Sequence, residues 1–165
     1  MGYWFVFITI TIALSSGFSQ AYGEQKVFST WEGFEADKLA SIWLIKRFIA
    51  PGAVIVILPK GQLIKQGIQF DTPNAEVTRK FNKATFESFL EHYRIKDRKL
   101  INIGKLIHDI EINTWERKLF KRTREVEIHI IEILEKYRGN EEIIAKACEY
   151  FDHLYSRLPE ELERN

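Results

Sequence analysis

The sequence of 165 residues contains one cysteine, Cys148, so no disulfide can form within the chain. The hydrophobic core alone must therefore hold the fold. Cys148 shares a stripe of helical spacing with Ile144 and Phe151, which is typical of a small buried thiol rather than a reactive one. The sequence also has no glycine-rich phosphate loop, no HExxH motif, no nucleophile elbow and no CxxC pair. Enzyme classes that depend on these motifs receive no support.

An excess of charge of either sign is also missing. The chain has 24 basic and 23 acidic residues, for a formal net charge of +1. A general nucleic-acid-binding or anionic-membrane-binding surface normally requires a clear basic excess. We therefore expect no nucleic-acid partner.

The first 23 residues carry no charged side chain, and residues 3–14 form an almost unbroken apolar run. About a dozen apolar residues followed by small ones are typical of a signal peptide. Cleavage is expected after Gly23, with Ala21 as the alternative. The run is shorter than the roughly 20 residues needed to span a bilayer, so no stable span is expected after cleavage. The sequence predicts an exported protein, periplasmic or extracellular.

The remaining segment, residues 24–165, has the size of one domain. A helix is expected to start near Asp37, whose carboxylate would cap its first turn, and to end at Pro51. The β-branched run at 53–58 predicts a buried strand, and residues 68–70 predict a second short strand.

Helices dominate the second half of the predicted domain. Thr85 or Asn82 is expected to cap one helix, and Asp97 the next. A long helix is expected over residues 115–137, followed by another that ends near Leu158. The predicted fold class is mostly α with a small β element, an α+β fold in a single helical domain after the signal peptide.

One candidate site centres on His108, with Asp109 beside it and Glu111 three residues further along the same predicted helix. Imidazole and carboxylate groups suit a divalent metal ion, and Glu87 and Glu91 of the preceding helix are possible further ligands. A capped or solvated histidine explains the same pattern.

Basic and acidic side chains form two further candidates. Lys38 and Arg47 belong to a basic group whose planar guanidinium suits a tetraoxo anion. The alternatives are solvated helix charges or, for Arg47, partial burial against an acid. Asp71 and Glu76 flank the turn at Pro73, where carboxylates are either functional or ordinary turn residues.

Residues 31–112 resemble the chromate-resistance protein domain, found in ChrB-like regulators and in stand-alone exported proteins. Four ordered blocks carry the resemblance: DK at 37–38 with WLIKRF at 43–48, FDTPNAE at 70–76, TFE at 85–87 and HDIE at 108–111. Where the family usually has a histidine before the TFE block, this chain has Arg79. A guanidinium offers no lone pair to a metal, so this departure weakens metal binding and adds a donor for an anion. The winged-helix part of the regulators has no counterpart, so the resemblance does not imply transcriptional control.

The resemblance implies an exported chromate-resistance-type protein that binds an oxyanion or a metal ion in a polar pocket. Lys38, Arg47 and Arg79 would contact an anion. The metal ligands or polar floor would be Asp37, Asp71, Glu76, Glu87, His108 and Asp109. One alternative is a metal-dependent enzyme that activates water through His108 and Asp109. Another is a structural module that binds a partner.

Overall fold

The computed structural model describes residues 25–113 and 117–165. The predicted signal peptide, residues 1–23, lies outside this part of the chain, as does the expected start of the long helix at Trp115. Within the two described ranges, no helix combines the length and the apolarity needed to cross a membrane.

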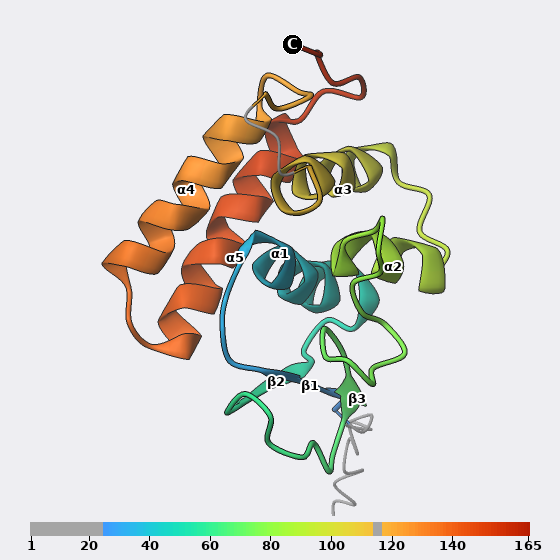
Figure 1. The fold of residues 1–165 in the computed structure, drawn as a ribbon, viewed down its shortest axis with the longest axis vertical. Helices are drawn as coiled ribbons and strands as arrows, with labels where there is room; N and C mark the ends of the chain where they lie inside the picture. The colour runs from blue at the N-terminus through green and yellow to red at the C-terminus, as the bar shows by residue number, and fades with distance from the viewer. Residues whose placement is uncertain (1–24, 114–116) are drawn as a thin grey trace, which may run out of the picture.

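Three short parallel strands form a small sheet: β1 (Val27–Trp31), β2 (Val54–Leu58) and β3 (Ile68–Gln69), in the order β2-β1-β3 (Figure 1). Strand β2 confirms the prediction from the β-branched run at 53–58, and β3 confirms the second short strand predicted at 68–70, whereas β1 was not predicted. Its sequence, VFSTW, places two polar residues at the centre of the sheet. Ser29 is nevertheless buried, because its hydroxyl donates to the carbonyl of Gln66 in the neighbouring loop at 2.8 Å.

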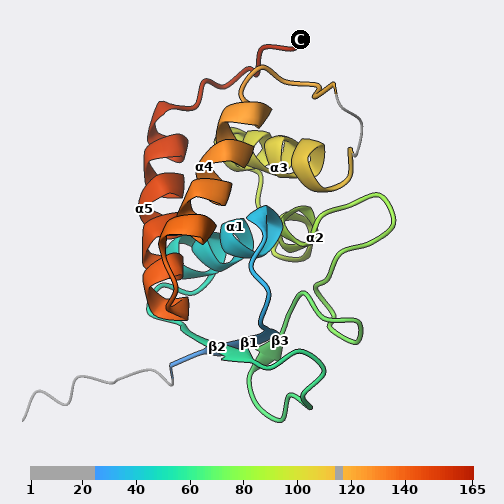
Figure 2. The same ribbon diagram turned by 60° about the vertical axis from the view of Figure 1, so that its left-hand side comes forward.

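The central element is α1 (Ala36–Leu44), which continues as one π-helical turn, Ile45–Ile49. This helix connects β1 to β2 and lies between two pairs of helices, so all nine of its residues are buried (Figures 1 and 2). The flanking helices are α2 (Thr85–His92), α3 (Arg98–Glu111), α4 (Thr123–Lys136) and α5 (Asn140–Arg157).

Aromatic side chains fill the core around α1. Trp43 is fully buried and stacks on Phe151 of α5 with 5.5 Å between ring centroids. Phe28 of β1 meets Phe70 edge to face at 6.4 Å, and Phe70 lies 5.7 Å from Phe89 of α2, so these rings join the sheet to the helices. Contacts of this kind add to the free energy gained from burying apolar area. The predicted α+β class is confirmed.

Three predictions about helix starts are wrong. Neither Thr85 nor Asn82 caps α2, because the N-cap residue of that helix is Ala84. Asp37 does not cap its own helix: the N-cap residue is Glu35, whose side chain makes no capping hydrogen bond, and the amide of Asp37 instead donates to the carboxylate of Glu111 in α3 at 3.3 Å. The fourth helix begins at Thr123 rather than near Trp115, and residues 117–122 are not helical. The predicted cap at Asp97 is confirmed, since its carboxylate accepts a hydrogen bond from the amide of Leu100 at 2.9 Å.

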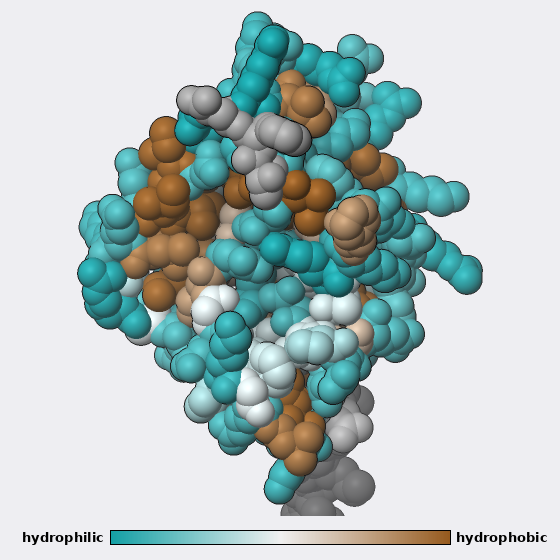
Figure 3. Space-filling model, viewed as in Figure 1, coloured by the Kyte–Doolittle hydropathy of each residue, from teal (hydrophilic) through white to brown (hydrophobic). Residues whose placement is uncertain are grey.

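The face shown in Figure 3 is mostly polar, with a broad apolar area at the left, over α4, and smaller apolar areas at the lower end and in the upper half. Ile128 and Ile131 of this helix are each 48% exposed, while Val126 and Ile130 face the core. Acidic residues flank the two isoleucines on the exposed side, at Glu125, Glu132 and Glu135.

Candidate functional site

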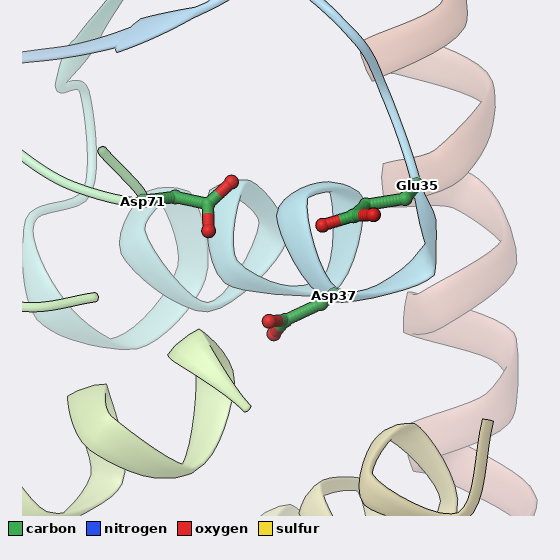
Figure 4. Close-up of side chains that lie close together, drawn as sticks. All are labelled: Glu35, Asp37 and Asp71. Carbon is green, nitrogen blue, oxygen red and sulfur yellow. The ribbon is translucent and has the colours of Figure 1, made fainter. Parts of the chain in front are cut away.

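Three carboxylates from separate segments converge beside the start of α1 (Figure 4). Glu35 precedes the helix, Asp37 lies in its first turn, and Asp71 follows β3. One oxygen of each lies within 4.8 Å of the others. We call Glu35, Asp37 and Asp71 the acidic triad.

Asp37 is fully buried, and its carboxylate caps the start of another helix, α2. Its two carboxylate oxygens accept hydrogen bonds from the backbone amides of Thr85 at 2.7 Å and Phe86 at 2.8 Å, at the start of α2. The first amides of a helix have no partner within that helix, so a carboxylate stabilises them well. Burial raises the pKa of Asp37 to about 7, against the lowering effect of the two amides.

Asp71 is held on the opposite side of the triad. Its backbone adopts a φ of 52°, a left-handed conformation that aspartate tolerates better than most residues. One carboxylate oxygen accepts the hydroxyl of Thr85 at 2.7 Å, and the other lies 3.4 Å from the ammonium of Lys38. That ammonium also donates to the carbonyls of Trp31 at 2.8 Å and Gly33 at 2.9 Å. All three of its hydrogens therefore have an acceptor nearby.

Arg79 brings a second positive charge to the triad. One terminal nitrogen, Nη2, lies 2.8 Å from Glu111, 3.0 Å from Glu35 and 3.6 Å from Asp37. The side chain is 35% exposed, so the guanidinium stands between the buried acid and the solvent. Burial alone would lower its pKa, but the neighbouring carboxylates of Glu35 and Glu111 raise it.

Negative groups outnumber positive ones here. The carboxylates of the triad and of Glu111 face the ammonium of Lys38 and the guanidinium of Arg79. Burial, and then repulsion by Glu111, raise the pKa of Glu35. Burial is thus the main cause of the raised pKa, and the neighbouring carboxylates of Glu111 and Asp71 add to it.

A solvent-open hollow of about 560 Å³ gives access to the cluster. Its charged lining residues are Glu32, Glu35, Lys38, Lys60, Asp71 and Arg79. Asp37 is not part of the lining, because it lies behind Arg79 and Glu35. A small ion in the hollow would have access to Glu35 and Asp71, the two members of the triad that line it.

Glu87 and His108 form a separate contact that bonds α2 to α3. Imidazole Nδ1 of His108 lies 2.8 Å from Glu87 Oε2, which also accepts the amide of Ala84 at 2.9 Å. The carboxylate is thereby fixed, and it fixes the ring in turn. Glu91, the other predicted partner, instead pairs with Lys83 at 2.7 Å.

Asp109 is buried in a different environment from its neighbour His108. Its carboxylate accepts hydrogen bonds from the amides of Leu119 at 2.7 Å and Phe120 at 3.2 Å, and from the hydroxyl of Thr123. Burial alone would raise its pKa, but these bonds and one from Asn113 lower it. The carboxylate thus holds residues 119–123 against α3. The fourth helix therefore begins at Thr123, after this segment, rather than near Trp115.

Arg47 and Glu76 make contacts away from the triad. The guanidinium of Arg47 forms a fork with Asp152 of α5, at 3.0 Å from Nε and 2.8 Å from Nη2. Glu76 is 81% exposed and lies 3.7 Å from the imidazole of His92.

The structure therefore brings together four of the predicted site residues, Asp37, Lys38, Asp71 and Arg79. Glu35 was missed, since one acid just before a predicted helix start carries no distinctive signal. Glu111 was identified as a neighbour of His108 on α3, yet its carboxylate contacts Arg79 and the amide of Asp37.

A family model described as ChrB, C-terminal domain, matches residues 28–158, a range that includes the whole triad. No curated protein and no solved structure matches the chain.

Proposed function

The chain belongs to the ChrB C-terminal domain family, which relates it to chromate resistance, and on this premise we propose that it binds a small inorganic cation at the acidic triad. The observation that carries the proposal is the convergence of oxygens from Glu35, Asp37 and Asp71 within 4.8 Å of one another. Oxygens at such separations need only small shifts to contact one ion at about 2.0 to 2.6 Å.

The ligand chemistry favours a hard divalent cation such as Mg²⁺, Mn²⁺ or Ca²⁺. The triad offers only carboxylate oxygens, which suit these ions, whereas copper and zinc prefer imidazole or thiolate. His108 and Cys148 are engaged or buried in other parts of the fold.

The same contacts disfavour the oxyanion version of the proposal. The ammonium of Lys38 is directed at two carbonyls and Asp71, and Arg79 is held by carboxylates. Arg47 is paired with Asp152. A chromate-like anion in the hollow would find these positive charges neutralised and would meet the carboxylates of Glu35 and Asp71.

A second candidate, a metal-dependent enzyme that activates water, has one supporting contact. Glu87 fixes the ring of His108 by a bond to Nδ1, as carboxylates do for many ligating or catalytic histidines. Asp109, its other proposed member, is committed to holding residues 119–123.

Titration calorimetry with MnCl₂ on metal-free protein tests the proposal. Wild-type protein is expected to bind one Mn²⁺, and Glu35→Gln to bind it at least about tenfold more weakly, because one ligand charge is lost. Glu76→Gln, an exposed acid outside the triad, is the matched control and should bind as wild type does. Absence of binding by wild type, or an equal loss in both variants, would refute the site. Sodium sulfate should give no heat of binding; a sulfate site would favour the oxyanion version.

We also propose that residues 1–23 direct export and are then removed. The support is the uncharged, apolar composition of this segment. Amino-terminal sequencing of the protein from a periplasmic extract should begin at Glu24, or at Tyr22 for the alternative cleavage. Intact protein confined to the cytoplasm would refute export.

A further inference from the structure

The acidic triad is already in contact with a positively charged side chain of the protein, the guanidinium of Arg79. Arg79 Nη2 lies 3.0 Å from Glu35 and 3.6 Å from Asp37, so the guanidinium contacts two of the three carboxylates that would bind a metal ion. Its shortest contact, 2.8 Å, is with Glu111, which is not a member of the triad. The guanidinium of Arg79 therefore occupies the same carboxylates that a metal ion would need.

Resting on the cation site proposed above, we propose that Arg79 is a tethered cation that competes with the metal ion and sets its affinity. A guanidinium cannot coordinate the metal, because it has no lone pair to offer. It can only repel the metal and share its ligands. Arg79 is thus a specificity-determining residue, because a metal ion can bind the triad only when the guanidinium moves away from it.

Electrostatics make simultaneous occupancy unfavourable. Two like charges about 4 Å apart repel strongly near a protein surface, and the repulsion doubles when one of them is divalent. A metal ion bound to Glu35 and Asp37 would lie at about this distance from Nη2, given the contacts of 3.0 and 3.6 Å. The guanidinium must therefore move away from the triad when the ion enters.

The position of Arg79 permits this movement. The residue belongs to the loop between β3 and α2, and its side chain is 35% exposed. Glu111 offers it an anchor that does not depend on the triad. The guanidinium can keep this partner, or turn into the open hollow, while the metal takes its place beside Glu35.

Lys38 does not play the same part. Its side chain is 7% exposed and its ammonium donates to two backbone carbonyls at 2.8 and 2.9 Å, so it is fixed in the fold. It lies 3.4 Å from Asp71 alone among the triad. Lys38 is therefore a fixed positive charge beside the triad. The guanidinium of Arg79 is the positive group that a metal ion can displace.

Ions of different charge should respond differently to this competition. A divalent ion gains enough from three carboxylates to displace one guanidinium, whereas Na⁺ or K⁺ carries no more charge than the group it would replace. Arg79 should therefore exclude monovalent ions from the triad. Removing its charge should raise the affinity for Mn²⁺ and make the site sensitive to K⁺.

The test is calorimetric titration of MnCl₂ into metal-free wild type, Arg79→Gln, Arg79→Lys and Arg98→Gln. Arg98 pairs with Glu160 on an exposed surface and controls for the general loss of one positive charge. We expect Arg79→Gln to bind Mn²⁺ at least about tenfold more tightly than wild type, and Arg98→Gln to match wild type. In 150 mM KCl, Arg79→Gln should lose part of this gain, and wild type should change less.

Failure of this inference and failure of the cation site give different results. If wild type binds Mn²⁺ and Arg79→Gln binds it no more tightly, the site stands and the competition is refuted. If only Arg79→Gln binds, the competition stands and cation binding by wild type is refuted. If neither binds, both are refuted. Should Arg79→Gln not fold, Arg79→Lys decides: a looser hold on the triad should strengthen Mn²⁺ binding, and unchanged or weaker binding refutes the inference.

Discussion

Asp37 in α1 caps α2 through the backbone amide of Thr85, 48 residues away, at 2.7 Å. The second oxygen accepts the amide of Phe86 at 2.8 Å. One buried carboxylate therefore joins two helices and contributes to the acidic triad. On the proposed function, fold stability and ion binding would be coupled at this residue.

Replacing Asp37 by alanine should destabilise the protein by about 2 to 4 kcal/mol, because two buried amides lose a charged acceptor. Urea denaturation of the metal-free protein measures the change. Asp97→Ala is the control, as it removes an ordinary helix cap worth about 1 kcal/mol. An equal loss in the two variants would show that the link between α1 and α2 adds nothing beyond a local cap.

The stability of metal-free protein should fall as the pH rises from about 4 to about 7. The pKa of Asp37 is raised from 3.8 to about 7 in the folded state, so in this interval the native protein binds a proton that the unfolded chain has released. The raised pKa of Glu35 acts in the same direction. Asp109 has a lowered pKa and so loses its stabilising effect only at lower pH.

Urea midpoints measured across this pH range in the presence of a chelator check the effect. The slope should be shallower in Asp37→Asn, which cannot ionise. Binding of Mn²⁺ should strengthen with pH until above about 7, because the metal requires the deprotonated carboxylate. A wild-type slope that Asp37→Asn retains unchanged would assign the pH dependence to other groups.

Asp109→Ala should destabilise the fold by about 2 to 4 kcal/mol while leaving Mn²⁺ affinity within about twofold. Its carboxylate accepts two backbone amides and the hydroxyl of Thr123, and these groups would be left without an acceptor. Denaturation and calorimetry on the same preparation separate the two effects. Loss of metal binding in a folded variant would instead favour the enzyme hypothesis in which His108 and Asp109 act together.

Arg47→Ala should cost no more than about 1 kcal/mol and should change neither Mn²⁺ nor sulfate binding. The pair with Asp152 is about two-fifths exposed, and exposed ion pairs contribute little. Thermal melting and the two titrations check this expectation. A sulfate site in wild type that disappears in Arg47→Ala would contradict the placement of ion binding at the triad.

Sequence patterns identified those features that depend on near neighbours. The strand at Val54–Leu58 and the cap at Asp97 were both predicted, because each follows from a few adjacent residues. Strand β1 was missed because its central residues, Ser29 and Thr30, are polar. Ser29 is buried through a bond to Gln66, which lies 37 residues further along the chain.

The candidate site, too, could be predicted only in part from the sequence. Asp37, Lys38, Asp71 and Arg79 were four of the nine candidate residues and lie together in the fold, but the basic members were expected to face an anion. The structure instead pairs Lys38 with Asp71, and Arg79 with Glu35 and Glu111. Which charges neutralise each other is decided by packing between distant segments, and the spacing of residues along the chain carries no such information.

The location of bound Mn²⁺ in a crystal of wild-type protein is the most direct test of the central claim. Anomalous scattering should place one ion within coordination distance of carboxylate oxygens of Glu35, Asp37 and Asp71, with the guanidinium of Arg79 displaced from its contacts of 3.0 and 3.6 Å. An ion bound elsewhere, or a triad still occupied by Arg79 at saturating Mn²⁺, would contradict the account.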